Sequence, residues 1–541
     1  MKRSAMASFV VCLVLAGLGF SPARAHAGTY EIEFLDDFMV DSSYGGETVS
    51  LSANVFWPKA ANGIKFPAII CPSSWGLNEH EYTVQAKRFA EEGYVVFSYT
   101  PRGFYKSTGL IEVAGPEDMA DLSACIDWVV VNAPADPDRI GMAGISYGAG
   151  ISLLGSAHDE RIRTVFSMSG WADIGEALYG AETVRLVWGE ILLITGKLTG
   201  DLDPIVNEYF DDLLHDRSVD QVLDWAAVRS PSSYLDTINR RGIPIYISQN
   251  WGDELFQPNA EMDLYSALTT RDKRLGLYLG IHATAELGGL LGIPNEVWAN
   301  AHAWFDYWFK GLDSPLLHEP RVSMHVKNSD EVLYFHDWPS REIVNQSYYL
   351  GARSLRSKGK LQAAPQLSPA VDVIRAGFES GATTGIPVLS PFFEAHTEYE
   401  VKVPVADIDR ALAVVYTSDP LPSTRMIAGI PTLEIWVEPH DTEFEVVAYL
   451  YDVDARGIAT LITHGPVSDH DATPGQVTKV SLDLVGAAYK IRAGHRIGLA
   501  IDTFDAEYAV PTLEPYALTF HYGGTAARPK LTVPYKGTSG N

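Results

Sequence analysis

Residues 30 to about 170 alternate between short apolar runs and segments whose apolar side chains recur at helical spacing. Met119, Leu122, Ile126 and Val129, for example, fall on one face of a helix. Apolar strands that alternate with helices predict a mostly parallel sheet covered by helices on both faces. The predicted strands are Glu47–Trp57, Phe66–Cys71, Tyr94–Tyr99, Arg139–Ile145 and Thr164–Ser169, and the predicted helices are Tyr82–Glu92 and Glu117–Val131.

The strand pattern stops over residues 171–236, where apolar positions such as Leu186, Val187 and Ile191 follow helical spacing. We predict a helical cap over these residues, inserted into an α/β domain that comprises residues 30–170 and 237–315. The second part of that domain is predicted from strand patterns at Ile243–Ser248 and Leu275–Leu279 and from a closing helix at Glu296–Phe309.

Residues 320–541 have a different pattern, in which short alternating runs are separated by frequent turn residues. This pattern is typical of an all-β sandwich or jelly roll. The weak periodicity of Ser354–Val373 predicts a loop there. The predicted strands are Ala413–Thr417, Thr432–Val437, Phe444–Val453, Val480–Leu484 and Ile497–Ile501.

The N-terminus has the features of a signal peptide over residues 1–25. Lys2 and Arg3 precede an apolar stretch, Phe9–Phe20, and Ala23-Arg24-Ala25 is a small-x-small cleavage site. The alternative is a membrane anchor, but the apolar stretch is shorter than the roughly 20 residues that span a bilayer. The sequence therefore predicts export, to the periplasm or out of the cell, and no membrane attachment after cleavage.

The chain of 541 residues is 46% hydrophobic and carries a formal charge of −27, which becomes −30 when residues 1–25 with their three basic side chains are removed. This negative charge disfavours nucleic acid and anionic lipid as partners. The expected partner is a small-molecule substrate, and the sequence predicts no oligomeric state. Cys71 and Cys125, which remain after cleavage, lie in apolar patterns and are predicted to be buried free thiols.

The strongest chemical motif is Gly144-Ile145-Ser146-Tyr147-Gly148, which matches G-x-S-x-G. An apolar strand precedes it and a helix start rich in small residues follows it. This is the context of a nucleophile elbow, in which a sharp turn exposes the serine hydroxyl above the sheet of an α/β-hydrolase fold. Ser146 is therefore predicted to be a nucleophile.

A serine nucleophile needs a base that is oriented by an acid, and in this fold the chain order is Ser, then Asp or Glu, then His. Two later strands end in candidates: Ile243–Ser248 leads to Asp253, and Leu275–Leu279 leads to His282. Side chains just past the carboxyl ends of parallel strands meet at one edge of the sheet. We predict that His282 acts as the general base and that Asp253 orients it.

The tetrahedral intermediate of acyl transfer needs two hydrogen-bond donors for its oxyanion. The first is predicted to be the backbone N–H of Tyr147, the residue after the nucleophile. The second is expected from the loop Pro72–Gly76, which follows the strand Phe66–Cys71.

These motifs resemble the superfamily of serine hydrolases that contains cocaine esterase and the X-prolyl dipeptidyl-peptidases. Besides the serine motif, the resemblance rests on residues in the same order along most of the chain. They are Arg102-Gly103, Ser107 and Gly109, Trp251-Gly252-Asp253, Gly280-Ile281-His282, Trp308-Phe309-Lys310-Gly311, Thr417-Ser418-Asp419-Pro420-Leu421 and Ala493-Gly494-His495-Arg496. The resemblance implies an α/β-hydrolase domain, a helical cap and a C-terminal jelly roll that helps to wall the active site.

In this family the loop after the third strand presents a tyrosine hydroxyl to the oxyanion, and the matching position here holds Trp75. One hypothesis is that the indole N–H of Trp75 replaces that hydroxyl, since indole can donate a hydrogen bond. The alternative is that Trp75 only walls the acyl pocket and that a backbone N–H is the second donor.

The resemblance implies a small ester or a short peptide as substrate. In family members that cleave amino-acid esters, acidic residues bind the free amine, and some of them lie just past the catalytic Asp. Here Glu254 follows Asp253 but the next residues, Leu255 and Phe256, are apolar, which argues against an enzyme specialised for amino-acid esters. The acidic anchor that a dipeptidyl-peptidase needs for the N-terminus of its substrate is not identified in the sequence. We therefore predict a carboxylesterase for neutral acyl or aryl esters, with an X-Pro dipeptidyl-peptidase as the alternative and a non-catalytic binding protein as the alternative of another class. No cofactor is expected, and the spacing of Asp452, Asp454, His464, Asp469 and His470 matches no metal site.

Overall fold

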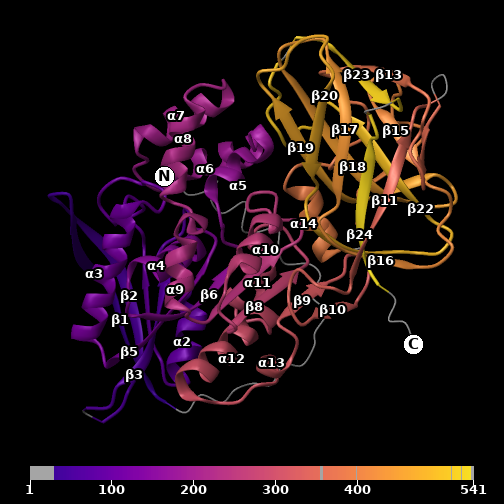
Figure 1. Ribbon diagram of the computed structural model, residues 1–541. Helices are drawn as coiled ribbons and strands as arrows, with labels where there is room; N and C mark the ends of the chain where they lie inside the picture. The colour runs from indigo at the N-terminus through magenta and orange to yellow at the C-terminus, as the bar shows by residue number, and fades with distance from the viewer. Residues whose placement is uncertain are drawn as a thin grey trace.

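The computed structural model describes residues 30–61, 63–353, 357–397, 399–512, 514–524 and 527–537. Figure 1 shows an α/β region, coloured indigo to rose, with an all-β region in orange and yellow at its upper right. The predicted signal peptide, residues 1–25, lies outside the described residues.

The α/β region is built on a sheet with the strand order β1-β2-β4-β3-β5-β6-β7-β8-β9-β10. Neighbouring strands from β4 to β9 are parallel, whereas β1, β2 and β10 are antiparallel to their neighbours. The predicted α/β-hydrolase fold is confirmed. The strands are β1 (Ile32–Tyr44), β2 (Glu47–Pro58), β3 (Phe66–Pro72), β4 (Val95–Tyr99), β5 (Ala135–Ile145), β6 (Ile162–Met168), β7 (Ile245–Asn250), β8 (Lys273–Tyr278), β9 (Val322–His325) and β10 (Val332–Phe335).

Helices cover both faces of this sheet because its central strands are apolar on both sides. Along β3, Ala68 and Ile70 pack into one core, and Ile69 and Cys71 pack into another on the opposite face. This alternation is expected, because successive side chains of a β-strand point to opposite faces of the sheet. The helices are α2 (Thr83–Glu91), α3 (Pro116–Asn132), α4 (Tyr147–His158), α9 (Leu235–Arg241), α10 (Pro258–Ala267), α11 (Thr284–Leu290), α12 (Glu296–Lys310) and α13 (Pro315–His318).

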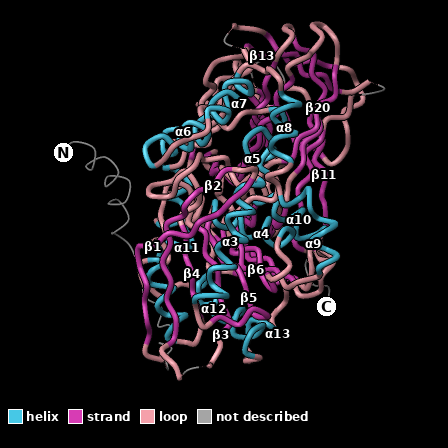
Figure 2. Tube along the Cα trace, turned by 90° about the vertical axis from the view of Figure 1, so that its left-hand side faces the viewer, coloured by secondary structure: helices cyan, strands magenta, loops and turns pink. Residues whose placement is uncertain are grey.

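The segment between β6 and β7 contains the helical cap. Figures 1 and 2 show its helices together at one end of the sheet, beside the all-β region. They are amphipathic: in α7, Tyr209 and Leu213 are buried one turn apart. The cap helices are α5 (Ile174–Tyr179), α6 (Leu186–Thr199), α7 (Pro204–Leu214) and α8 (Val219–Ala227), with short 3₁₀ turns η1 (Gly180–Glu182) and η2 (Pro231–Tyr234).

The C-terminal region is an all-β domain around its own apolar core, and nearly all of its strand pairs are antiparallel. The strand Phe444–Val453 has the predicted bounds. The elements are β11 (Ile343–Gly351), β12 (Gly359–Gln362), β13 (Ala370–Arg375), α14 (Leu389–His396), β14 (Lys402–Pro404), β15 (Val414–Thr417), β16 (Arg425–Gly429), β17 (Thr432–Pro439), β18 (Phe444–Val453), β19 (Ile458–Asp469), β20 (Thr478–Asp483), β21 (Ala487–Ile491), β22 (Arg496–Asp502), β23 (Ala517–Tyr522) and β24 (Lys530–Lys536).

Two sequence predictions about the second half of the chain are wrong. The all-β domain does not begin at residue 320, because β9 pairs in parallel with β8 and therefore extends the first sheet, with β10 as its last strand. The segment Ser354–Val373 is not simply a loop: it contains β12 and the start of β13. Strands of four residues, such as β9, β10 and β12, are too short to show a clear period in the sequence.

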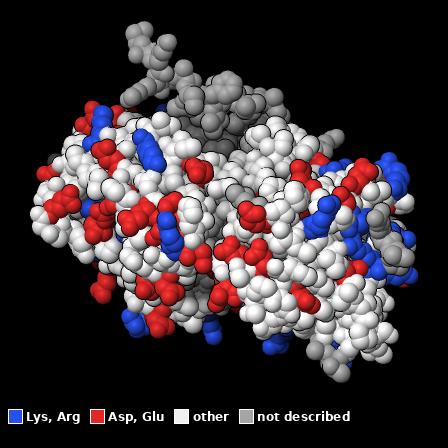
Figure 3. Space-filling model, turned by 90° about the horizontal axis from the view of Figure 1, so that it is seen from above, with Lys and Arg blue, Asp and Glu red and all other residues white. Residues whose placement is uncertain are grey.

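Figure 3 shows acidic side chains spread over the face seen from above, consistent with the formal charge of −27. Among the residues that the structure describes, no helix combines the length and the apolar character needed to cross a membrane. Cys71 and Cys125 are separate buried thiols, as predicted.

Candidate active site

Ser146 sits in a strained turn between β5 and α4. Its φ of 56° and ψ of −117° lie outside the regions that ordinary side chains prefer. The flanking glycines make this turn possible, because a Cβ on Gly144 would lie 2.3 Å from the carbonyl carbon of Gly148, and one on Gly148 would lie 2.1 Å from the carbonyl oxygen of Pro72. The turn is the nucleophile elbow that the motif predicts.

The structure brings Ser146, His282 and Asp253 together at the edge of the sheet. The Oγ atom of Ser146 lies 2.7 Å from Nε2 of His282, and Nδ1 of His282 lies 2.9 Å from Oδ2 of Asp253. A carboxylate can only accept a hydrogen bond, so Nδ1 carries the proton and Nε2 is left to accept one from the serine hydroxyl. This is the hydrogen-bond order required for a serine to be deprotonated as it attacks.

Asp253 is held on both of its oxygens. While Oδ2 accepts from His282, Oδ1 accepts from the backbone N–H groups of Leu255, at 3.1 Å, and Phe256, at 2.9 Å. The side chain is completely buried. Three donors satisfy a buried carboxylate and fix its direction, so the imidazole ring of His282 is fixed as well.

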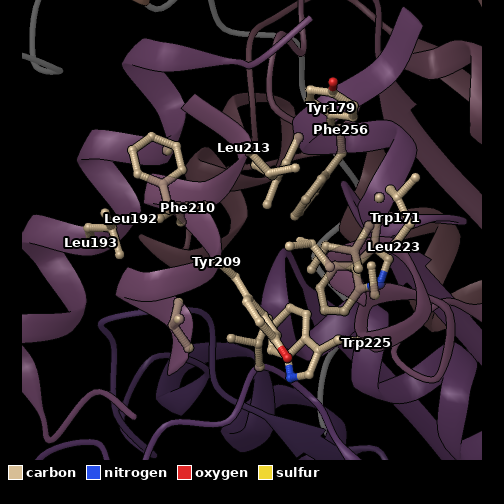
Figure 4. Close-up of a pocket in the computed structure, with 18 of the residues that line it drawn as sticks. Trp171, Tyr179, Leu192, Leu193, Tyr209, Phe210, Leu213, Leu223, Trp225 and Phe256 are labelled. Atoms are coloured by element: carbon tan, nitrogen blue, oxygen red, sulfur yellow. The ribbon is translucent and has the colours of Figure 1, made fainter. Parts of the chain in front are cut away.

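Ser146 lines an apolar pocket. Figure 4 shows aromatic and aliphatic side chains of the cap helices that surround it. The pocket has a volume of about 90 Å³, and all four cap helices contribute to its lining. Apart from Ser146 and two glycines, every lining residue is aliphatic or aromatic. They include Trp75, Tyr147, Trp171, Leu178, Leu192, Leu193, Val206, Tyr209, Phe210, Leu213, Val222, Trp225 and Phe256. Such a pocket binds apolar groups through the burial of their surface.

Trp75 lines this pocket, but its indole N–H is engaged elsewhere. Nε1 donates to the carbonyl oxygen of Leu192, at 3.0 Å, and lies 3.1 Å from Oγ1 of Thr195, both on α6 of the cap. This placement does not support the predicted donor role of the Trp75 side chain, because one N–H cannot serve the cap helix and an oxyanion at once. Among the described residues, the backbone N–H groups of Trp75 and Tyr147 have no hydrogen-bond acceptor.

A polar cluster that the sequence did not reveal lies where the cap, the α/β domain and the all-β domain meet. We call Arg185, Glu254 and Glu507 the junction cluster. Within the described part of the chain, Nε and Nη1 of Arg185 and both carboxyl oxygens of Glu507 are buried without hydrogen-bond partners. Burial raises the pKa of Glu254 to about 8 and that of Glu507 to about 10. Sequence periodicity cannot detect isolated charged residues that long-range folding brings together.

The described residues contain no group of three or more His, Cys, Asp or Glu side chains that could hold a metal ion.

Comparison with known proteins identifies the family of the chain. The model of the X-Pro dipeptidyl-peptidase (S15) family matches residues 45–284, and that of the X-Pro dipeptidyl-peptidase C-terminal non-catalytic domain matches residues 317–535. A protein from Bacillus anthracis named "Putative Xaa-Pro dipeptidyl-peptidase" is 21% identical over 87% of this chain and 83% of its own length. Cocaine esterase from Rhodococcus sp. is 22% identical over 82% of this chain and 85% of its own length.

Solved structures support the same fold over nearly the whole chain. A CocE/NonD family hydrolase from Staphylococcus aureus superposes with a TM-score of 0.73 at 14% identity and covers 93% of this chain and 94% of its own. The two family models match adjacent parts of the chain, the relatives span both domains, and the fold is shared. The chain belongs to the serine hydrolase superfamily of cocaine esterase and the X-Pro dipeptidyl-peptidases.

Proposed function

We propose that the protein is a carboxylesterase that hydrolyses esters of small apolar carboxylic acids through an acyl-enzyme on Ser146. The observation that carries this proposal is the hydrogen-bonded chain Ser146–His282–Asp253 at the floor of an apolar pocket. The acyl group occupies the pocket, whose lining is apolar on nearly every side.

In the first step, Oγ of Ser146 attacks the carbonyl carbon while its proton passes to Nε2 of His282. Asp253 stabilises the imidazolium through Nδ1. The carbonyl oxygen becomes an oxyanion that accepts hydrogen bonds from the backbone N–H groups of Tyr147 and Trp75, and the N-terminus of α4 adds positive potential. His282 then protonates the departing alcohol, and the acyl group stays on Ser146.

In the second step, water enters the site and His282 removes a proton from it as it attacks the acyl-enzyme. The second tetrahedral intermediate uses the same two N–H donors. Its collapse returns the proton from His282 to Oγ of Ser146 and releases the carboxylic acid. No cofactor is required for either step.

The test is a parallel assay of p-nitrophenyl butyrate and an X-Pro-anilide. We expect hydrolysis of the ester, and we expect kcat/KM to rise about fourfold for each methylene from acetate to butyrate, because each buried CH₂ is worth about 0.8 kcal/mol. Ser146→Ala should abolish the activity. Faster cleavage of the anilide than of the ester would instead support the second candidate, an X-Pro dipeptidyl-peptidase, which the family name and the buried acid Glu254 favour.

We further propose that the protein acts after export, a proposal supported by the signal pattern of residues 1–25. N-terminal sequencing of the protein from its host tests this. A mature chain that starts near His26 is expected, and an intact N-terminus in the cytoplasm would contradict it.

A further inference from the structure

The loop that contains Trp75, residues 73–76, is held by a carboxyl group that the mechanism does not use. The backbone N–H of Ser74 donates to Oε2 of Glu81 at 2.7 Å. The hydroxyl oxygen of Ser74 lies 2.7 Å from Oε1 of Glu81 and 2.9 Å from the carbonyl oxygen of Ile145. Glu81 thus holds the N–H and the hydroxyl of the residue immediately before Trp75, whose carbonyl oxygen accepts from the backbone N–H of Leu77 at 3.0 Å.

Tyr82, the residue after Glu81, holds Ile145, the residue before the nucleophile. The hydroxyl oxygen of Tyr82, a buried side chain, accepts a hydrogen bond from the backbone N–H of Ile145 at 2.9 Å. Ile145 therefore contacts Tyr82 through its N–H and Ser74 through its carbonyl oxygen. Glu81 and Tyr82 connect the loop 73–76 and the turn at Ser146 into one hydrogen-bonded unit.

Burial of a carboxyl group at this place costs free energy. Burial raises the pKa of Glu81 to about 7, although three hydrogen bonds partly offset the effect. A shorter or monodentate side chain could not accept from the N–H and the hydroxyl of Ser74 at once. Glu81 therefore fixes one end of Ser74, and the N–H of Leu77 fixes the carbonyl oxygen at the other end, from which the peptide of Trp75 continues.

We propose that Glu81 is a positioning residue of the oxyanion hole. By fixing Ser74, it orients the following peptide so that the N–H of Trp75 points at the oxyanion that forms on Ser146. The proposal rests on the carboxylesterase function proposed above and adds the group that aligns its second donor. The indole contact of Trp75 with α6 fixes the ring, whereas Glu81 fixes the backbone.

The experiment compares Glu81→Ala with Glu81→Gln, and Glu91→Ala at the end of α2, the helix that follows Glu81, is the control. Glu81→Ala removes both acceptors, so kcat for p-nitrophenyl butyrate should fall about 30- to 100-fold, somewhat less than the loss of a whole oxyanion donor. KM should change less than about threefold. In Glu81→Gln the amide oxygen still accepts from the Ser74 N–H, and the amide N–H donates to the Ser74 hydroxyl, so most of kcat should return.

Two inhibitors separate positioning from a general loss of structure. Butylboronic acid forms a tetrahedral adduct with a catalytic serine and reports on the oxyanion hole, whereas butyrate occupies only the acyl pocket. Affinity for the boronic acid should fall in Glu81→Ala by the same factor as kcat, and affinity for butyrate should stay within about twofold.

An equal loss for both inhibitors, or a kcat of Glu81→Ala within threefold of wild type, would overturn the proposal. If Glu81→Ala does not fold, Glu81→Asp replaces it: its shortened carboxylate cannot reach both groups of Ser74, so its kcat should fall below that of Glu81→Gln. An equal or higher kcat for Glu81→Asp would refute the role. Wild-type protein that hydrolyses no ester would instead refute the proposed carboxylesterase function. This result differs from those that refute the role of Glu81.

Discussion

Helix α6 of the cap borders two regions of opposite character. Gly189, Leu192 and Leu193 line the apolar pocket above Ser146, where no charged side chain is present. Arg185, at the start of the same helix, belongs to the junction cluster with Glu254 and Glu507. Burial raises the pKa of both carboxyl groups and the positive charge of Arg185 partly offsets this rise, although no oxygen of either carboxyl lies within ion-pair distance of Arg185.

The difference shows how one helix can contribute to two functions. In the pocket, affinity comes from apolar surface that leaves water, which depends little on pH. In the junction cluster, burial disfavours the ionised form of both carboxyl groups, so a rise in pH that ionises them works against the folded state. We infer that the pocket determines which acyl groups are bound and that the junction cluster makes the stability of the fold depend on pH.

The largest effect is expected for Asp253, and the adjacent carboxyl group of Glu254 provides the contrast. Asp253→Asn should lower kcat by a factor of about 10³ to 10⁴, because an amide cannot stabilise the imidazolium of His282 and favours the wrong tautomer. Glu254→Gln should leave kcat at pH 7 within about threefold, since burial keeps the pKa of Glu254 at about 8 and the group is already neutral. Equal losses in the two variants, measured with p-nitrophenyl butyrate, would contradict the assignment of roles.

The next largest effect on activity is expected when a polar side chain is introduced into the pocket. Leu213→Asn should lower kcat/KM for p-nitrophenyl butyrate about 10- to 100-fold, because the acyl chain would have to desolvate an amide. The acetate ester, which reaches less far, should lose less. Leu198→Asn on the outer face of α6, where the side chain is 75% exposed, is the control and should have no measurable effect. Equal losses for acetate and butyrate would mean that the acyl group does not enter this pocket.

The junction cluster predicts a pH-dependent stability. Glu507 has a pKa of about 10 when folded and an ordinary value of 4.5 when unfolded. Between these values only the unfolded chain releases the proton, so stability falls as pH rises through this window. Glu507→Gln cannot ionise and should raise the melting temperature at pH 8 by about 2–4 °C, with little change at pH 4.5. Calorimetry at both pH values tests this, and an unchanged slope with pH would refute the contribution of Glu507.

The smallest effect is expected for Trp75→Phe. Its indole N–H contacts α6 and not the oxyanion, so kcat for p-nitrophenyl acetate should fall less than about threefold. A loss of a hundredfold or more would restore the hypothesis that the side chain is an oxyanion donor.

Much of this architecture is predictable because the responsible patterns are local. The apolar strands Phe66–Pro72 and Ile245–Asn250 and the helix Pro116–Asn132 have strong periods, and the G-x-S-x-G turn marks the nucleophile. Asp253 and His282 could be located as residues just past strand ends. Strand β1 was not predicted, because it is an edge strand whose side chains are mostly exposed and carry little apolar alternation.

Features that depend on contacts between distant segments were not predictable. The orientation of Trp75 is set by α6, which lies more than a hundred residues later in the chain. The junction cluster joins residues 185, 254 and 507, and no local period connects them. Glu81 likewise looks like a surface acid in the sequence, and only its contacts with Ser74 reveal its position.

The most direct test of the central claim is covalent labelling with a fluorophosphonate probe, followed by intact-mass and peptide mass spectrometry. A fluorophosphonate reacts with a serine whose hydroxyl is activated by a histidine and whose oxyanion hole is formed. We expect one label per wild-type chain, on Ser146, labelling at least a thousandfold slower in His282→Ala, and none in Ser146→Ala. Label on another residue, or equal rates in wild type and His282→Ala, would contradict the account.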